Sequence, residues 1–194
     1  MITEEMLFHQ AFVLYQEYGV KFTMGDLAAR LGISKKTLYE LVSSKDELVA
    51  RAVTQYFDAV EREQADIRKD SSLNALQKTE RLLCVVPQMP FHEYRIRELR
   101  RAFPGAYLRL TERLETEWEK TFSVMDEAIL EGLLAVFDKT LFGKIYAYVM
   151  EGLMLEREQR TTADFAEEQC RAVRMLLGGI CTERGRDSLQ SACE

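Results

Sequence analysis

Apolar residues recur at spacings of three and four near the start of the chain. Leu7, Ala11 and Leu14 fall on one stripe, which predicts an amphipathic helix over about residues 4–18. Gly19 follows this helix directly and suits the left-handed conformation with which many helices end. The opening residues therefore form one helix with a single buried face.

The next stretch predicts two very short helices joined by a tight turn. Thr23 is a candidate N-cap with an acid, Asp26, three positions later, which is close to a capping box. Gly32 ends this helix, and Ser34 is the candidate N-cap of the following one, over residues 35–41. A short turn with a glycine, an apolar residue and a cap is typical of the helix-turn-helix, whose second helix enters the major groove of DNA.

The rest of the chain, to about residue 181, also has a helical pattern with few breaks. A long helix is predicted over residues 45–69, and two separate helices over 105–122 and 124–136. The chain has only 3 prolines and 10 glycines, and Leu, Glu, Arg, Ala and Met are plentiful, so the composition also favours helices. The tail, residues 182–194, is rich in Arg, Asp, Ser and Gln and is predicted to be flexible. The predicted fold class is all-α.

The charge of the chain argues against a broadly basic nucleic-acid binder. The formal net charge is −6, and residues 1–50 hold five Lys or Arg against seven Asp or Glu, a net charge of −2. Three of these five cations, Lys35, Lys36 and Lys45, fall between positions 35 and 45. Affinity for DNA phosphates must therefore come from local placement of charge.

Several functional classes find no support in the sequence. No apolar run approaches the roughly 18 residues that cross a bilayer, and the first residues do not resemble a secretion signal, so we expect a cytoplasmic protein without membrane contact. The 4 cysteines lack CxxC spacing and there are only 2 histidines. Unpaired thiols are therefore expected, and neither a metal site nor a cofactor is predicted. No catalytic constellation or phosphate-binding glycine loop indicates an enzyme.

Two segments carry a specific resemblance to a known family. The run Asp-Leu-Ala-Ala-Arg-Leu-Gly-Ile-Ser-Lys-Lys-Thr-Leu-Tyr over residues 26–39, and Ser-Lys-Asp-Glu-Leu over residues 44–48, are similar to the DNA-binding domain of the tetracycline-repressor (TetR) family. The opening helix matches the same family, so the resemblance covers about residues 4–50. It departs at Leu41 and Val42, where the family has an aromatic or His followed by Phe. We expect Leu41 to lack the phosphate contact of that position and Val42 to keep its core role.

The resemblance implies a domain organisation with about nine helices. Residues 1–48 would form a three-helix DNA-binding domain with the helix-turn-helix. Residues 49–181 would form a helical domain that binds an effector and dimerises.

The resemblance also implies which residues face DNA. Lys can donate to guanine and Glu can accept from cytosine in the major groove, so the candidates for reading bases are Lys35, Lys36 and Glu40. Hydroxyl groups and charge make the phosphate candidates Thr23, Ser34, Thr37, Tyr39 and Lys45. Each has a simpler alternative: a solvated surface for the charged residues, a capping role for the two N-caps, and a core position for the tyrosine.

The C-terminal part offers two further candidate sites. Its last two predicted helices, over residues 138–157 and 162–180, have wide apolar faces, which either belong to the chain's own core or pair across a two-fold axis as in the family. The candidate dimer residues are Leu141, Ile145, Val149, Gly152, Phe165, Val173, Leu176 and Ile180. Aromatic and methionine side chains in the middle helices either fill the core or line the family's effector pocket. The candidate pocket residues are Phe91, Tyr94, Tyr107, Trp118, Phe122, Met125 and Tyr146.

The sequence thus predicts a DNA-binding transcriptional regulator. Its expected form is a ligand-responsive repressor that binds a palindromic operator as a homodimer, with double-stranded DNA, a second copy of itself and a small-molecule effector as partners. The alternative is a ligand-independent, DNA-bound adaptor that recruits a protein partner. A closed cavity in the C-terminal domain would favour the former, and a well-packed core the latter.

Overall fold

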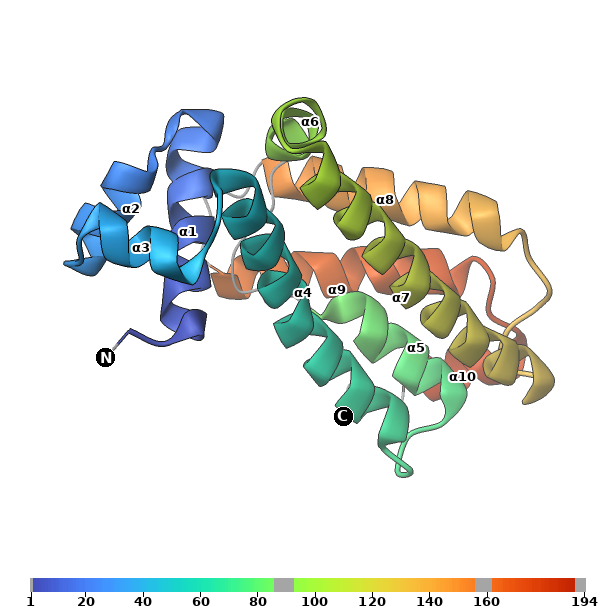
Figure 1. The fold of residues 1–194 in the computed structure, drawn as a ribbon. Coiled ribbons are helices and arrows are strands. Elements are labelled where there is room, and N and C mark those ends of the chain that lie inside the picture. The colour runs from blue at the N-terminus through green and yellow to red at the C-terminus, as the bar shows by residue number, and fades with distance from the viewer. Residues whose placement is uncertain (1, 86–92, 156–161, 191–194) are drawn as a thin grey trace. The chain divides into compact units, whose positions relative to one another are not determined.

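The computed structural model describes residues 2–85, 93–155 and 162–190. Within these ranges the chain forms ten α-helices and one short 3-10 helix, and no strand (Figure 1). The predicted all-α fold class is confirmed, with one helix more than the expected nine. In chain order the elements are α1 (Glu4–Tyr18), η1 (Gly19–Lys21), α2 (Met24–Leu31), α3 (Lys35–Leu41), α4 (Lys45–Lys69), α5 (Ala75–Cys84), α6 (Glu93–Ala102), α7 (Pro104–Leu130), α8 (Lys139–Leu155), α9 (Thr162–Gly178) and α10 (Glu183–Gln190). None of the helices so described is both long and apolar enough to span a membrane.

The helices gather into two compact units. Unit 1 consists of Met1–Ala59 and Phe91–Glu115, and unit 2 of Val60–Pro90 and Thr116–Glu194. The unit that contains the helix-turn-helix is therefore built from two separate stretches of sequence. α4 and α7 each contribute residues to both units.

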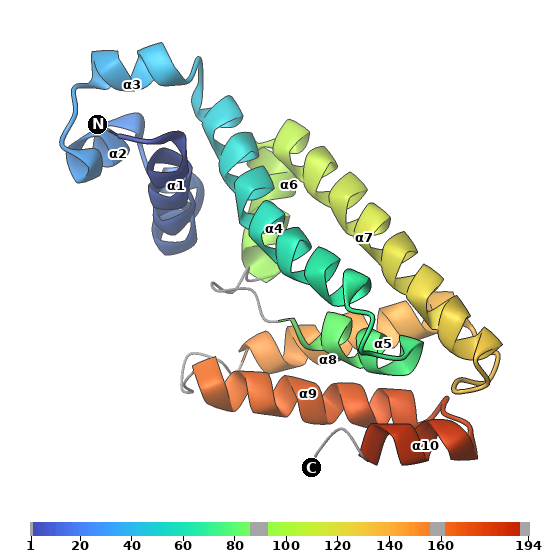
Figure 2. The same cartoon turned by 90° about the horizontal axis from the view of Figure 1, so that it is seen from below.

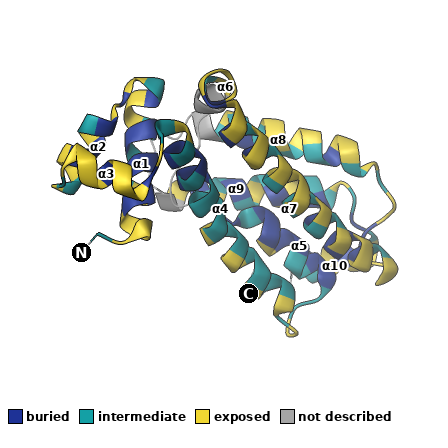
Figure 3. Cartoon of the chain, viewed as in Figure 1, coloured by how far each residue is buried: buried dark blue, intermediate teal, exposed yellow. Residues whose placement is uncertain are grey.

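Unit 1 is built around the inward face of α1. Thr3 caps this helix by accepting a hydrogen bond from the backbone N–H of Met6 at 3.2 Å. The helix ends at Gly19, whose φ of 58° is one that a glycine adopts easily. Tyr18, at the end of the helix, is exposed. The predicted stripe faces the core, where the buried residues of α1 are Leu7, Phe8, Ala11, Phe12, Leu14 and Tyr15 (Figure 3).

Unit 2 is organised around α9. This helix packs against α5 on one side and lies along α8 on another (Figure 2). α7 and the connection that follows it supply further side chains to the centre. The residues that are almost fully buried there are Leu76, Met125, Leu134, Phe165, Val173 and Leu177.

α7 corrects one prediction. Residues 105–122 and 124–136 were expected to form two helices, but a single helix runs from Pro104 to Leu130. Ser123 alone does not break the helix, because the buried residues Val124 and Met125 continue its apolar face. The helix ends just before Gly132, which has a φ of 72°.

α10 corrects the prediction of a flexible tail. Part of the segment predicted to be a flexible tail is helical, because a cap and a buried contact hold it. The hydroxyl of Thr182 accepts a hydrogen bond from the N–H of Gly185 at 3.1 Å, and Leu189 is buried against the core of unit 2. Gly185 is needed because a Cβ there would lie 2.0 Å from the carbonyl oxygen of Leu133.

Candidate DNA interface

Two short helices and the turn between them form the helix-turn-helix. α2 ends at Gly32, whose φ of 67° is left-handed and whose N–H bonds to the carbonyl oxygens of Ala28 and Ala29. Ser34 then caps α3, because its hydroxyl oxygen accepts a hydrogen bond from the N–H of Thr37 at 3.0 Å. The predicted turn and its glycine and serine are present in the structure.

α3 is attached by a narrow apolar edge and exposes the rest of its surface. Leu38 is its one buried residue, and Val42, directly after the helix, is also buried, as expected. The side chain of Tyr39 is 52% exposed, so it does not belong to the core. The exposed residues of α3 are Lys35, Lys36, Thr37, Tyr39, Glu40 and Leu41 (Figure 3). A helix attached in this way can present its outer side chains to a groove of DNA.

The side chain of Lys35 lies over the beginning of α2. A Cβ added to Gly25 would lie 2.7 Å from Cε of Lys35 and 2.9 Å from its Nζ. The missing side chain at Gly25 therefore gives the lysine room to rest there. Its charge also helps to lower the pKa of the Asp26 carboxyl. To reach a base, Lys35 has to swing away from α2, whereas Lys36 is exposed at the next position.

Thr23 and Asp26 form the predicted capping box at the start of α2. The Asp26 carboxylate accepts hydrogen bonds from the backbone N–H of Thr23 at 2.7 Å and from its hydroxyl at 2.9 Å. The Thr23 hydroxyl oxygen in turn accepts one from the N–H of Asp26 at 3.2 Å. The backbone hydrogen bond, followed by the hydroxyl one, holds the pKa of Asp26 below its ordinary value of 3.8.

Lys45, at the start of α4, turns its ammonium group into unit 1. Its Nζ donates one hydrogen bond to the carbonyl oxygen of Val20 at 2.7 Å and another to that of Phe22. The Nζ also lies 4.2 Å from the centroid of the Phe22 ring and 5.6 Å from that of Phe103, within the range of cation–π attraction. Burial lowers the pKa of this ammonium, and the carboxylate of Asp26 opposes the shift. The group expected to contact a phosphate is thus bound to backbone carbonyls here.

The formal charge of the chain is unevenly divided between the two units. Residues 1–59 carry −2, but residues 91–115, which belong to the same unit, hold six Arg and four Asp or Glu. Unit 1 is therefore formally neutral, and the whole net charge of −6 belongs to unit 2. The lysines of α3 thus sit in a unit that is not repelled by phosphates as an acidic domain would be.

Comparison with known proteins identifies the family of this chain. Residues 7–52 match the family model described as bacterial regulatory proteins, tetR family. A relative, the uncharacterized HTH-type transcriptional regulator YvaF of Bacillus subtilis (strain 168), is 29% identical over 191 residues, which is 95% of this chain and 99% of that protein. The structure of the ketosteroid transcriptional regulator KstR2 of Mycobacterium tuberculosis matches with a TM-score of 0.69 and 19% identity, and the match covers 94% of this chain and 97% of that one. The chain is a TetR-family transcriptional regulator.

Another solved structure supports the same fold. A transcriptional regulator from Saccharomonospora viridis, solved in complex with choline, matches this TetR-family chain with a TM-score of 0.73. The two are 13% identical, and the match covers 91% of this chain and 96% of that one. At this identity the likeness concerns the fold alone.

The structure brings together four of the seven candidate pocket residues of the TetR-family regulator. Trp118 stacks on Phe122 with ring centroids 5.1 Å apart and meets Tyr146 edge-on at 5.3 Å, while Met125 belongs to the same core cluster. We call Trp118, Phe122, Met125 and Tyr146 the aromatic cluster. The Tyr146 hydroxyl donates a hydrogen bond to the carbonyl oxygen of Leu83 at 2.9 Å, and burial raises its pKa.

Of the other three pocket candidates, the structure places only Tyr107, which lies apart from this cluster. Tyr107 belongs to unit 1, where its ring centroid lies 5.9 Å from the guanidinium carbon of Arg100. Phe91 and the side chain of Tyr94 lie outside the described residues. Sequence spacing could not show that Tyr107 and Trp118, both on α7, belong to different units.

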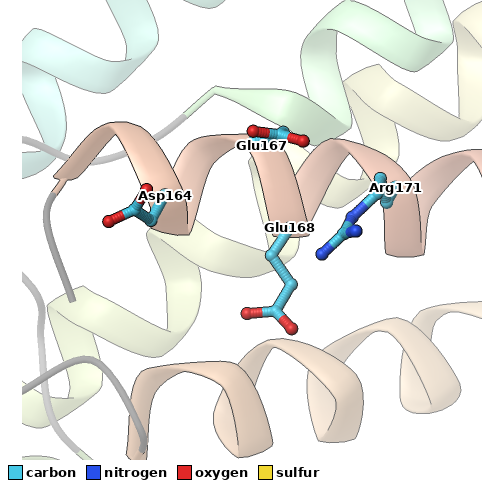
Figure 4. A pocket seen from close by; sticks show the side chains of 4 residues that line it. All are labelled: Asp164, Glu167, Glu168 and Arg171. Atoms are coloured by element: carbon cyan, nitrogen blue, oxygen red, sulfur yellow. The ribbon is translucent and has the colours of Figure 1, made fainter. Parts of the chain in front are cut away.

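A hollow of about 320 Å³ opens on the surface of α9 and was not predicted. Its described lining is polar and consists of Asp164, Glu167, Glu168 and Arg171 (Figure 4). It shares no residue with the aromatic cluster. The spacing of these charged residues by three and four positions is the sequence signal that places them on one helix face.

The candidate dimer residues divide into exposed and buried groups. Leu141 is 54% exposed and Ile145 41%, and Gly152 is exposed on the same helix. Phe165 and Val173 are each 0% exposed, because they face the core of unit 2, which corrects their assignment to an outer face. The remaining candidates, Val149, Leu176 and Ile180, are half-buried.

Two large apolar side chains on these helices are more exposed than Leu141 and Ile145. Tyr148 on α8 is 73% exposed and Met175 on α9 is 80% exposed. Tyr148 lies seven residues, or two helical turns, after Leu141. Helical spacing therefore places Tyr148, rather than Val149, on the same face as Leu141. On α9 the apolar residues are too scattered for the period alone to separate the inner face from the outer one.

Proposed function

We propose that this TetR-family regulator is a ligand-responsive repressor that binds a palindromic operator as a homodimer. The observation that carries the proposal is α3, which is anchored through Leu38 and exposes its other side chains. One short helix reads only a few base pairs. A two-fold dimer places two such helices in successive major grooves, so both half-sites contribute to affinity.

In this proposal, the residues that contact base edges are Lys36, Lys35 and Glu40. Lys36 and Glu40 are four residues apart, so they project from the same side of α3. Lysine can donate to guanine O6 or N7, and glutamate can accept from cytosine N4. Lys35 joins them once its side chain leaves Gly25.

Phosphate contacts come from hydroxyl groups around the turn. Ser34 and Thr37 share a hydrogen bond of 2.9 Å between their hydroxyl oxygens, and both are exposed. Thr23 and Tyr39 extend this set. Lys45 contributes by position, because it joins the start of α4 to the segment before α2 and so helps to fix where the helix-turn-helix stands.

The proposed dimer interface lies on the outer faces of α8 and α9. Leu141, Ile145 and Tyr148 follow one another at helical spacing on α8, and Met175 is exposed on the adjacent α9. Side chains of this size that are exposed on two neighbouring helices are more typical of an interface than of a free surface. A second copy would cover them with the same face by two-fold symmetry.

The proposed effector site is the aromatic cluster. Aromatic rings and a thioether provide the apolar walls that small-molecule sites commonly have. A ligand that enters between these rings favours a different packing of unit 2. By linkage, operator affinity then falls by the factor by which the ligand prefers that packing.

Trp118 allows a direct test, because it is the only tryptophan in the chain. A panel of apolar small molecules is screened for a change in its fluorescence, and each hit is tested for release of operator DNA. We expect release at the concentration at which the fluorescence changes. Phe122→Leu should weaken both responses, and Phe137→Leu, whose ring packs on Phe142 at 5.4 Å, should not. If a ligand saturates the change in Trp118 fluorescence and leaves operator affinity unchanged, the regulator does not respond through this site.

A further inference from the structure

α5 and α9 pack as antiparallel neighbours, and their contacts fix the register between them. The guanidinium Nε of Arg174 lies 2.5 Å from Oε1 of Glu80. The side-chain amide of Gln169 donates to the carbonyl oxygen of Leu83 at 2.8 Å. Residue numbers therefore rise along α5 as they fall along α9.

This register brings two cysteines together. Cys84 lies one turn after Glu80, and Cys170 one turn before Arg174. The two side chains therefore lie on facing turns of adjacent helices, close enough for Cys170 to help raise the pKa of the Cys84 thiol. Both are unpaired and only partly buried, so a small reagent can reach them. We call Cys84 and Cys170 the thiol pair.

The surroundings hold the thiol pair in place. The carbonyl oxygen of Leu83, next to Cys84, accepts hydrogen bonds from both Gln169 and the Tyr146 hydroxyl. The end of α5 is thereby tied to α8 and α9. Thiols held on facing turns of two packed helices can reach the S–S bond length of about 2 Å by side-chain rotation.

We propose that the thiol pair is a site of reversible oxidation, at which a peroxide converts Cys84 and Cys170 into a disulfide between α5 and α9. The Cys170 sulfur attacks one peroxide oxygen and the O–O bond breaks, which gives a sulfenic acid and, after proton transfer, one water molecule. The Cys84 sulfur then attacks the Cys170 sulfur, loses its proton, and displaces the sulfenic oxygen as a second water molecule. Two thiols and one hydrogen peroxide thus yield one disulfide and two water molecules.

The order of the two steps follows from the setting of Cys84. Burial, more than the nearby Cys170, raises the pKa of the Cys84 thiol, and burial disfavours the thiolate that would attack a peroxide, so we assign the first attack to Cys170. Cys84 therefore resolves the sulfenic acid. Cys181 provides a contrast, because burial raises its pKa too but it lies in the core cluster of unit 2, away from the facing turns of α5 and α9 that hold the thiol pair.

The position of the thiol pair gives its oxidation a consequence for the regulator. Cys84 is the last residue of α5, and the chain passes from unit 2 to unit 1 after Pro90. A disulfide would fix the end of α5 to α9, six residues before the chain leaves unit 2. The loop that the bond closes runs from Cys84 to Cys170 and contains α6, α7 and α8, so the bond should also stabilise the folded chain.

The test uses the full-length protein treated with hydrogen peroxide, blocked with N-ethylmaleimide and digested with trypsin. Each cysteine falls in a different tryptic peptide, over residues 82–95, 161–171, 175–184 and 187–194. Mass spectrometry should find 82–95 joined to 161–171, with the intact protein lighter by two hydrogen atoms, and dithiothreitol should reverse both changes. The thermal midpoint should be higher for the oxidised than for the reduced protein.

Single variants serve as controls. Cys84→Ser and Cys170→Ser should each abolish the cross-link and the rise in thermal midpoint, whereas Cys181→Ser should retain both. Cys84→Ser should also accumulate a sulfenic acid on residues 161–171, which dimedone labels. The proposal is overturned if these two peptides stay unlinked at peroxide levels that oxidise the methionines, or if they pair with the other cysteine peptides as often as with each other.

Discussion

The ammonium group of Lys45 lies 4.2 Å from the centre of the Phe22 ring and also bonds to the carbonyl oxygen of that residue. The contact joins the first turn of α4 to the segment between η1 and α2. The ring centroid of Phe103 lies 5.6 Å from the same ammonium, and this ring also meets the ring of Tyr15 edge-on, with centroids 6.2 Å apart. One lysine thus connects three separate parts of unit 1.

Lys45→Met should therefore destabilise the protein in the absence of DNA. Loss of hydrogen bonds from a charged donor to two carbonyl groups should lower the free energy of unfolding by about 1–3 kcal/mol. Urea unfolding followed by circular dichroism measures it. Lys69→Met, an exposed lysine at the far end of α4, is the control. The opposite result would be unchanged stability, weaker operator binding and a salt dependence of binding reduced by about one phosphate contact. It would show that Lys45 contacts a phosphate, as expected from the sequence.

Lys36→Ala should weaken operator binding selectively. Loss of one good base contact costs about 1–3 kcal/mol on the specific site, whereas binding to unrelated DNA should change much less. Fluorescence anisotropy with the operator and with a scrambled duplex, at one fixed salt concentration, separates the two. Lys35→Ala should behave in the same way. An equal loss of affinity for both duplexes would show that these lysines contact phosphates rather than bases.

The capping box at Asp26 should make stability depend on pH. Its pKa is lower in the folded chain than the ordinary 3.8, so its stabilisation is present above that value and is lost as the pH falls through the folded pKa. Asp26→Asn should therefore lower the urea midpoint at pH 7, and the difference from the wild type should shrink as the pH falls below 3.8. Asp66→Asn, an exposed carboxylate on α4, is the control. A difference that persists unchanged at pH 2 would show that the carboxylate charge is not responsible.

Ile145→Glu should convert the proposed homodimer into a monomer. A charge placed in the proposed apolar face of α8 would have to be buried without a partner. Light scattering at micromolar protein concentration should report half the mass of the wild type, and operator affinity should fall. Leu130→Glu is a matched control, because Leu130 is 86% exposed on α7, outside the proposed face. If Leu130→Glu also dissociates the dimer, or Ile145→Glu does not, the interface lies elsewhere.

The sequence predicted the helix-turn-helix well because its signals are local. Thr23 and Asp26 are three residues apart, as are Ser34 and Thr37, and Gly32 needs only its own backbone conformation. Such contacts depend on the order of residues along a few positions. They form in the structure as expected.

What the sequence missed depends on residues that are distant along the chain. The ammonium of Lys45 finds carbonyl groups 25 and 23 residues earlier, which no local pattern reveals. Helical spacing identified apolar residues on α9 but not which of them face the core, so Phe165 was chosen and Met175 was not. The neutral charge of unit 1 likewise required knowing that residues 91–115 join the first 59.

The central claim, a dimer that reads a palindrome through α3, is tested most directly by selecting bound fragments from random double-stranded DNA with the full-length protein. We predict enrichment of a palindrome whose half-site centres are about one helical turn of 10 base pairs, or a multiple of it, apart. The Lys35→Ala, Lys36→Ala double variant should lose the enrichment. Enrichment of single half-sites without symmetry, or of the same palindrome by the double variant, would contradict the account.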